Sequence, residues 1–246
     1  MYVRYVSPFL SLLKSTGRGS MMGNVKRRIM CGGKAMTAIV LAGGRGRRMK
    51  ADKARLAVGG RTLLEHVLGQ LEPYFGEILV SVSRGQKAEL AAGSGSRARA
   101  DLRGEAAGRS ASFGVVVDKV PDLGPLGGIL AGLKAATNDA CAVVACDIPD
   151  IDVPLLRSLA RAASEADIAV TVGTAGHYEP LFAVYRRVVV PEIEALLRSG
   201  ERSIIPLFGR CRTAAVRFED AGRLRNLNTR AEYQDYLKTL ARKRRS

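Results

Sequence analysis

The sequence predicts a single three-layer α/β domain in which helices cover both faces of a mostly parallel sheet. Short continuous apolar runs, with the length of buried strands, alternate along the chain with amphipathic segments of helical period. A glycine-rich turn follows the first of these runs, and no internal repeat or clear linker divides the chain. The 246 residues are ample for a sizeable core.

The apolar runs give the order of the elements. Strands are predicted at residues 37–40, 78–82, 114–117, 142–145, 168–172, 181–185 and 213–218. Helices are predicted at residues 62–75, 126–136, 154–163, 190–197, 203–208 and 230–240. Thr62 and Asp152 stand where helix N-caps are expected. Residues 84–112, rich in Gly, Ala, Ser and Arg, predict a short helix within a flexible insertion.

The two ends of the chain differ from its body. Residues 1–35 contain seven Lys or Arg and no acidic residue, and no small-residue cleavage site follows their apolar run convincingly. We predict that they are an extension, either disordered or the product of a start codon assigned upstream of a true start at Met36. The folded domain is then expected at residues 36–241, and a basic tail at 242–246.

Charge and cysteine content narrow the class of protein. Of the net charge of +16, seven positive charges lie in residues 1–35 and four in residues 242–245, which leaves +5 for the body. A modestly basic body suits an enzyme for phosphorylated substrates. A basic nucleic-acid-binding protein is the alternative, but the chain has only seven Tyr, six Phe and no Trp, and no recognisable nucleic-acid motif. Buried thiols, not a disulfide, are expected of Cys141 and Cys146, which fits the cytoplasm.

The glycine-rich turn is the first candidate site. It reads Leu41-Ala42-Gly43-Gly44-Arg45-Gly46-Arg47-Arg48-Met49, and Asp52-Lys53 follows. Glycines let backbone N–H groups approach an anion closely, and the clustered cations supply charge, so the stretch predicts a phosphate cradle. It lacks the Gly-Lys-Ser/Thr of a P-loop and does not match the dinucleotide fingerprint. A surface turn with solvated basic residues is the alternative interpretation.

Two acidic residues follow other predicted strands. Because ligands of such sheets bind beyond the carboxyl ends of the strands, Asp118 and Asp147 are expected near the glycine-rich turn. A carboxylate at Asp147 suits Mg²⁺, and Asp152 is the better cap for the helix that follows. Asp118 could hold a base or ribose, or it could belong to a turn that caps the next helix. Positioned cations and a metal ion dominate catalysis of nucleotidyl transfer, and the available cations are Arg45, Arg47, Arg48 and Lys53. Arg48 and Lys53, with Asp147, are the catalytic residues that we predict.

Five motifs, in this order, resemble those of the molybdenum cofactor guanylyltransferases, a family of the sugar-nucleotidyltransferase-like superfamily. They span about residues 36–240 and are Leu41-Ala42-Gly43-Gly44-Arg45 with Arg48-Met49 and Asp52-Lys53; Asp118 with Gly124-Pro125-Leu126-Gly127-Gly128; Cys146-Asp147-Ile148-Pro149; Glu179-Pro180-Leu181-Phe182-Ala183-Val184-Tyr185; and Asn226-Leu227-Asn228-Thr229. Each motif alone is weak, whereas five in order are specific. The resemblance implies a Rossmann-like nucleotidyltransferase fold.

The activity that the resemblance implies is Mg²⁺-dependent transfer of GMP from GTP to the terminal phosphate of molybdopterin, with release of pyrophosphate. It implies nucleotide contacts at Leu41, Ala42, Gly43, Gly44, Lys53, Ser81, Asp118 and Asp147. Asp147 is also the implied Mg²⁺ ligand, and Asn226 and Asn228 are implied on the acceptor side. Further implied partners are other proteins of molybdenum cofactor biosynthesis or molybdoenzyme chaperones, with neither nucleic acid nor membrane.

Other activities of the same fold stay open. This chain has Ser81-Val82-Ser83-Arg84 where the family often shows Asn-Ala-Asn-Arg, and its insertion at residues 84–112 is longer than usual. A cytidylyltransferase, or an enzyme acting on a phosphosugar or phospholactate, is therefore an alternative, as is a scaffold that binds nucleotide without turnover. The Leu-Ala-Gly-Gly opening favours the guanylyl branch, because cytidylyl relatives usually open with Ala-Ala-Gly.

Overall fold

The computed structural model describes residues 4–6, 27–42, 54, 56–83, 113–118, 124–174, 176–218 and 224–243. Its elements in chain order are β1 (Arg4–Val6), β2 (Met30–Cys31), β3 (Lys34–Ala35), β4 (Thr37–Leu41), β5 (Ala57–Val58), β6 (Arg61–Thr62), α1 (Leu63–Leu71), β7 (Glu77–Ser83), β8 (Gly114–Asp118), α3 (Gly124–Ala135), β9 (Ala140–Ala145), α4 (Val153–Ala162), β10 (Ile168–Val172), β11 (Tyr178–Arg186), the 3₁₀ helix η3 (Arg187–Val189), α5 (Val190–Arg198), α6 (Ile205–Arg210), β12 (Thr213–Arg217) and α7 (Arg230–Lys243). The strands and helices predicted within the described residues are confirmed, with ends that differ by a few residues. The short helix predicted within residues 84–112 lies outside the described residues.

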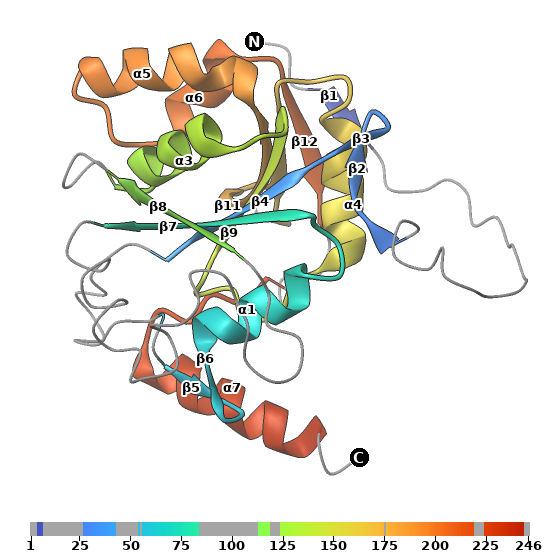
Figure 1. The fold of residues 1–246 in the computed structure, drawn as a ribbon, viewed down its shortest axis with the longest axis vertical. Helices are drawn as coiled ribbons and strands as arrows, with labels where there is room; N and C mark the ends of the chain where they lie inside the picture. The colour runs from blue at the N-terminus through green and yellow to red at the C-terminus, as the bar shows by residue number, and fades with distance from the viewer. Residues whose placement is uncertain are drawn as a thin grey trace, which may run out of the picture.

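An eight-stranded sheet forms the middle layer, in the order β1-β12-β10-β11-β9-β4-β7-β8 (Figure 1). Neighbouring strands pair in parallel except at β11, which runs antiparallel to both β9 and β10. From β4 the chain passes to β7 and β8 and then returns to β9 on the other side of β4. The carboxyl ends of β4 and β9 therefore form a topological switch point, where ligands of open α/β sheets bind.

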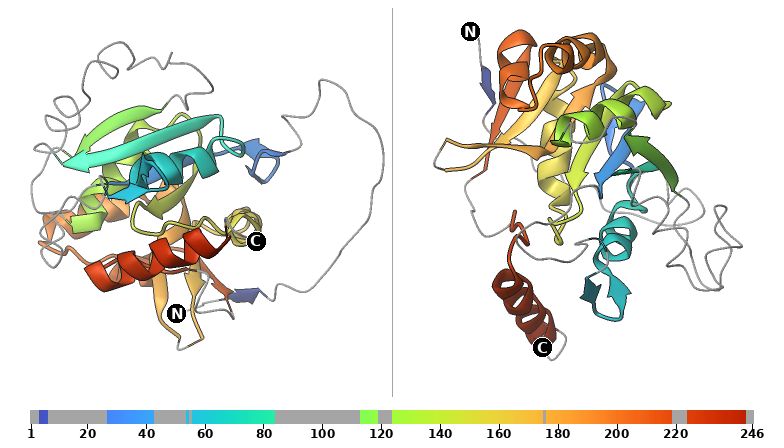
Figure 2. Two further views of the ribbon diagram at one scale, coloured as in Figure 1. Left: turned by 90° about the horizontal axis from the view of Figure 1, so that it is seen from below. Right: turned by 90° about the vertical axis from the view of Figure 1, so that its left-hand side faces the viewer.

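Helices cover both faces of the sheet, as the continuous apolar strands predict. Ile39 and Leu41 of β4 belong to one buried cluster with α3, α5 and α6, whereas Ala38 and Val40 belong to a second cluster with α1 and α4. This alternation is the two-residue period of a strand that is buried on both sides. The helix α7 and the β5–β6 hairpin lie at the other end of the molecule from α5 and α6 (Figures 1 and 2).

Two glycines let α3 lie unusually close to the sheet. A Cβ atom at Gly132 would lie 2.6 Å from Cγ2 of Ile39, and one at Gly128 would lie 3.1 Å from Oγ of Ser81. Atoms this close overlap, so a larger residue would push the helix or the strands apart. The close approach brings the amino-terminal half of α3 directly over the ends of β4 and β7.

Helix caps form at the two positions that the sequence predicts. Thr62 and Glu65 make a reciprocal capping box at the start of α1. The backbone N–H of Leu155 donates to Oδ1 of Asp152 at 3.0 Å, which caps α4. Because Asp152 serves as the cap, Asp147 is not needed for that role.

Part of the predicted N-terminal extension is ordered. Residues 27–35 include the β2–β3 hairpin, and Ile29 is only 2% exposed in the cluster that holds α1 and α4. The N–H of Ile29 donates to the carbonyl of Tyr74 at 3.0 Å, and Nη2 of Arg157 donates to the carbonyl of Arg27. Residues 27–35 thus pack against the body of the protein, and burial of Ile29 offsets part of the entropy cost of ordering them. A start of translation at Met36 stays a prediction.

The four cysteines are free thiols, and Cys31, Cys141 and Cys146 are buried, so the prediction that Cys141 and Cys146 do not form a disulfide is confirmed. Burial raises the pKa of Cys141 to about 12, so this thiol is not a nucleophile. In the part of the chain that the structure describes, no helix is both long and apolar enough to cross a bilayer.

Candidate active site

The predicted site residues that the structure describes lie at one edge of the sheet. Leu41 at the end of β4 is paired in register with Ser81 of β7 and with Ala145 at the end of β9. Asp118 ends β8, one strand beyond β7. Asp147 and Asp118 are thus three strand spacings apart, about 14 Å. The prediction that these strand ends border one crevice agrees with this register.

Backbone hydrogen bonds join the ends of these strands. The N–H of Cys146 donates to the carbonyl of Leu41 at 3.0 Å, and the N–H of Ala42 donates to the carbonyl of Ser81 at 2.9 Å. The N–H of Ala42 is already engaged in the sheet. Backbone donors for a phosphate at this turn therefore have to come from residues after Ala42, and these lie outside the described residues.

The segment before α7 adds the acceptor-side candidates to the same edge. The N–H of Leu227 donates to the carbonyl of Asp147 at 2.8 Å, and Nδ2 of Asn226 donates to Oε2 of Glu179 at 3.2 Å. One N–H of Nδ2 is engaged in this way, so the second N–H and Oδ1 of Asn226 are the groups that can face a ligand. Asn228 is exposed on the same segment. The structure therefore brings Asn226 beside Asp147 from a distant part of the chain.

Glu179 is a carboxylate of this edge to which the sequence assigned no role. Burial raises its pKa, hydrogen bonds from Asn226 and the backbone of Leu181 lower it, and the nearby charge of Asp147 raises it again, so that the net shift is upward. Glu179 lies near the amino end of β11. A mostly parallel sheet predicts the amino end of this strand at the far edge, and only the antiparallel direction of β11 brings Glu179 to Asp147. Its place directly before an apolar strand was the available signal.

Ser81 lies beneath α3. It is buried, and its Oγ lies close to the place that a Cβ of Gly128 would occupy. The hydroxyl therefore faces the amino-terminal half of α3, next to the side chain of Leu41. The remaining predicted residues, Gly43, Gly44, Arg48 and Lys53, lie outside the described residues.

The described donors fit a hard divalent cation. Asp147 and Glu179 are half-buried carboxylates close enough for the charge of one to raise the pKa of the other. Two such carboxylates repel each other, and a cation between or beside them relieves the repulsion. Within the described ranges no cluster of three or more His, Cys, Asp or Glu forms a complete cation site. Few protein carboxylates, completed by substrate phosphates, are the usual arrangement for Mg²⁺.

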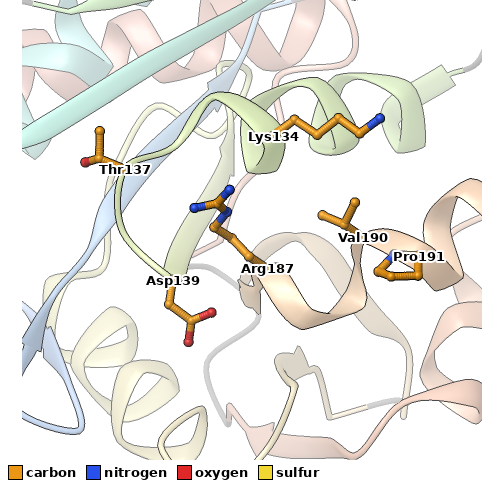
Figure 3. Close-up of a pocket in the computed structure, with 6 residues that line it drawn as sticks. All are labelled: Lys134, Thr137, Asp139, Arg187, Val190 and Pro191. Atoms are coloured by element: carbon orange, nitrogen blue, oxygen red, sulfur yellow. The ribbon is translucent and has the colours of Figure 1, made fainter.

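A pocket of about 560 Å³ lies at the opposite edge of the sheet (Figure 3). It is lined by Lys134, Thr137, Asp139, Arg187, Val190 and Pro191. Lys134 already pairs with Glu194, and Asp139 pairs with Arg186. None of the predicted site residues lines this pocket, so it is not the candidate site.

A family model described as a MobA-like NTP transferase domain matches residues 38–214, which include the switch point, Asp147 and Glu179. The chain belongs to this family. The MobA-like chain is therefore a nucleotidyltransferase, and the predictions of fold, family and enzyme class are confirmed.

Curated relatives agree with this assignment. The chain is 32% identical over 179 residues to a molybdenum cofactor guanylyltransferase from Vibrio parahaemolyticus, covering 72% of this chain and 81% of the relative. It is 28% identical over 215 residues to a probable molybdenum cofactor guanylyltransferase from Carboxydothermus hydrogenoformans, covering 85% of this chain and 98% of the relative.

A solved structure shares the fold. The molybdopterin-guanine dinucleotide biosynthesis protein A from Archaeoglobus fulgidus superposes with a TM-score of 0.65 at 23% identity, covering 84% of this chain and 100% of that one. At this identity the likeness concerns the fold.

Proposed function

We propose that this MobA-like nucleotidyltransferase transfers GMP from GTP to the terminal phosphate of molybdopterin and releases pyrophosphate, in the cytoplasm. The observation that carries the proposal is the convergence of Asp147, the end of β4 and Asn226 at the switch point. Support for the choice of substrates comes from the relatives named guanylyltransferases and from the Leu41-Ala42-Gly43-Gly44 opening.

The reaction forms a bond between a phosphate oxygen of the acceptor and the α-phosphorus of GTP, and it breaks the bond from that phosphorus to the bridging oxygen of the β-phosphate. The electron pair of the broken bond leaves with pyrophosphate. Negative charge spreads over the phosphate oxygens as the bond breaks, so stabilisation comes chiefly from positioned positive charge. Arg48 and Lys53 are the side chains of this chain that we assign to that task.

The chain orients the two substrates across the strand ends. We assign Asp118 and Ser81 to the nucleoside and the turn after Leu41 to the phosphates of GTP. The nucleotide would then lie along the strand ends, across the separation of about 14 Å between Asp118 and Asp147. Asn226 and Asn228 face the acceptor from the opposite side of Asp147. The attacking phosphate would then approach from the side away from the leaving group, as in-line displacement requires.

Asp147 would hold Mg²⁺, with Glu179 next to it. When bound, Mg²⁺ would neutralise phosphate charge and polarise the bond from phosphorus to the leaving oxygen. Asp147 itself contributes one carboxylate at a fixed place at the switch point. Other proteins of molybdenum cofactor biosynthesis or molybdoenzyme chaperones are the partners we propose for delivery of the product.

Calorimetric titration with GTP and with CTP, each with and without Mg²⁺, tests the substrate and the metal together. We expect GTP in the presence of Mg²⁺ to bind at least tenfold more tightly than CTP, about 1.4 kcal/mol. Tighter binding of CTP would show that CTP, and not GTP, is the substrate. If neither nucleotide binds, the proposal is contradicted.

Substitution of the metal carboxylate tests the role of Asp147. Asp147→Asn should lower kcat at least about a hundredfold while the protein stays folded. The control is Asp139→Asn, which removes a carboxylate of the opposite edge that pairs with Arg186. An Asp147→Asn variant with the turnover of the control would refute the metal role.

A further inference from the structure

The loop that carries Asp147 is held at nearly every residue. It connects β9 to α4 and runs from Cys146 to Asp152. Its ends are fixed by backbone and capping bonds, because the N–H of Cys146 donates to the carbonyl of Leu41 in β4, the N–H of Ile148 donates to the carbonyl of Ala145, and Asp152 caps α4. The middle of the loop is held instead by two side chains that come from α1 and α7, far away in the sequence.

Gln70 of α1 holds the backbone on both sides of Asp150. Its Nε2 donates to the carbonyl of Pro149 at 2.7 Å, and its Oε1 accepts from the N–H of Ile151 at 3.0 Å. A side-chain amide that donates to one backbone carbonyl and accepts from a backbone N–H two residues on replaces the C=O and N–H that one residue of a neighbouring strand would offer. The backbone of the loop is therefore hydrogen-bonded at Pro149 and Ile151 although no strand among the described residues pairs with it there.

Tyr236 of α7 holds the residue between those two bonds. The side chain of Tyr236 is 2% exposed, and its hydroxyl donates to Oδ1 of Asp150 at 2.9 Å. Nε2 of His66 lies 3.2 Å from the same hydroxyl oxygen. Since the one hydroxyl proton goes to Asp150, Nε2 of His66 carries the proton of the second bond. Burial and the charge of Asp150 raise the pKa of Tyr236, so the phenol stays a donor at neutral pH.

The helix that carries Tyr236 begins beside the acceptor-side candidates. Thr229 and Glu232 form a capping box at the start of α7, and Glu232 also accepts from the N–H of Asn228. Leu227, just before it, donates to the carbonyl of Asp147. The segment from Asn226 to Tyr236 therefore contacts the metal loop at two places, Asp147 and Asp150, which are three residues apart.

We propose that Gln70 and Tyr236 are positioning residues for Asp147. They fix the loop from Cys146 to Asp152, so that the carboxylate of Asp147 meets the metal in one orientation. Tyr236 also connects this loop to the acceptor side. This inference rests on the proposed function. The two residues act through the backbone of Pro149 and Ile151 and through the side chain of Asp150. Groups that orient a metal ligand commonly change metal affinity by tenfold or more.

Tyr236→Phe is the central test, because it removes one hydroxyl and keeps the ring. The matched control is Tyr233→Phe on the same helix, where the hydroxyl bonds the carbonyl of Ala57 and not the loop. The quantity to measure by calorimetry is the ratio of GTP affinity with Mg²⁺ to GTP affinity in EDTA. We expect Tyr236→Phe to lower this ratio about tenfold and to leave the affinity in EDTA unchanged, whereas Tyr233→Phe changes neither.

Gln70→Met is the second variant, with nearly the same side-chain volume and no hydrogen-bonding amide. It should lower the same ratio about tenfold, and thermal unfolding should show that both variants are folded. A ratio within twofold of the wild type in the folded variants would overturn the positioning role and leave the proposed function standing. A wild-type protein whose GTP affinity does not depend on Mg²⁺ would instead overturn the metal part of the proposed function, and this inference with it.

Discussion

The two edges of the central sheet use half-buried carboxylates in opposite ways. At the amino-terminal edge, Glu77 accepts hydrogen bonds from Thr37, from the hydroxyl and backbone N–H of Thr137, and from Asn138. Burial raises the pKa of Glu77, but these hydrogen bonds outweigh burial, and the pKa lies below its ordinary value of 4.5. Donors of the protein itself thus stabilise this charge through Oε2.

At the carboxyl-terminal edge, the hydrogen bonds to Glu179 do not compensate for the burial of its charge. Its pKa is raised, because burial and the charge of Asp147 outweigh the hydrogen bonds from Asn226 and Leu181. A satisfied carboxylate stabilises a fold, whereas two carboxylates that repel each other store electrostatic energy that a bound cation releases. The opposite directions of the two pKa shifts therefore distinguish the edge where hydrogen bonds stabilise the charge from the edge where we propose the ligand site.

The largest effect on stability is expected at the amino-terminal edge. Glu77→Ala leaves the hydroxyl of Thr37 and the N–H of Thr137 without their acceptor, and we expect a loss of about 2–3 kcal/mol in the free energy of unfolding. Urea unfolding measures it. The control Glu194→Ala, which removes a surface partner of Lys134, should leave the midpoint unchanged. If the two variants unfold at equal midpoints, Glu77 does not stabilise the amino-terminal edge more than a surface carboxylate does.

Alanine substitutions at the two close-packed glycines of α3, Gly128 and Gly132, should affect stability and GTP binding differently. Gly132→Ala places a methyl group against Ile39 and should cost about 1–3 kcal/mol, less the roughly 1 kcal/mol that alanine gains in a helix. Gly128→Ala presses on Ser81 and Leu41 at the looser distances of 3.1 and 3.2 Å, so its stability should change by less than about 1 kcal/mol. We expect Gly128→Ala to weaken GTP binding and Gly132→Ala to leave it unchanged, as measured by calorimetry of the folded proteins. The reverse pattern would contradict the assignment of Ser81 and Leu41 to the nucleotide.

Glu179→Gln should raise the thermal stability of the protein and lower its activity. The variant keeps an acceptor for Asn226 and removes the charge that opposes Asp147, so the free protein should unfold at a higher temperature than the wild type. Loss of the carboxylate near the metal should lower kcat/KM about tenfold, or 1.4 kcal/mol. Calorimetric melting and steady-state kinetics with Mg²⁺ measure the two effects. A variant that is less stable and fully active would show that Glu179 is a structural residue like Glu77.

The sequence predicts the layers of this fold better than the directions of its strands. Continuous apolar runs such as residues 142–145 indicate burial on both faces, and capping residues such as Asp152 indicate where helices begin. Direction is not encoded in such a run, so the antiparallel course of β11, and with it the place of Glu179, follows only from the structure. The bonds of Gln70 and Tyr236 to the loop after Asp147 join residues about 80 positions apart, which no local pattern predicts.

The acid dependence of stability gives the finest test of the comparison. Because the folded-state pKa of Glu77 lies below its unfolded value near 4.5, the unfolded chain binds more protons in acid. The contribution of Glu77 is therefore complete above pH 4.5 and is lost as the pH falls through the lower folded-state pKa. Glu77→Gln should be less stable than the wild type at pH 7, and the two free energies of unfolding should converge below pH 4.5. Other carboxylates, such as Asp167 beside Arg212, affect both proteins equally and cancel in the difference. Parallel curves between pH 7 and 3.5 would mean that the charge of Glu77 does not stabilise this edge.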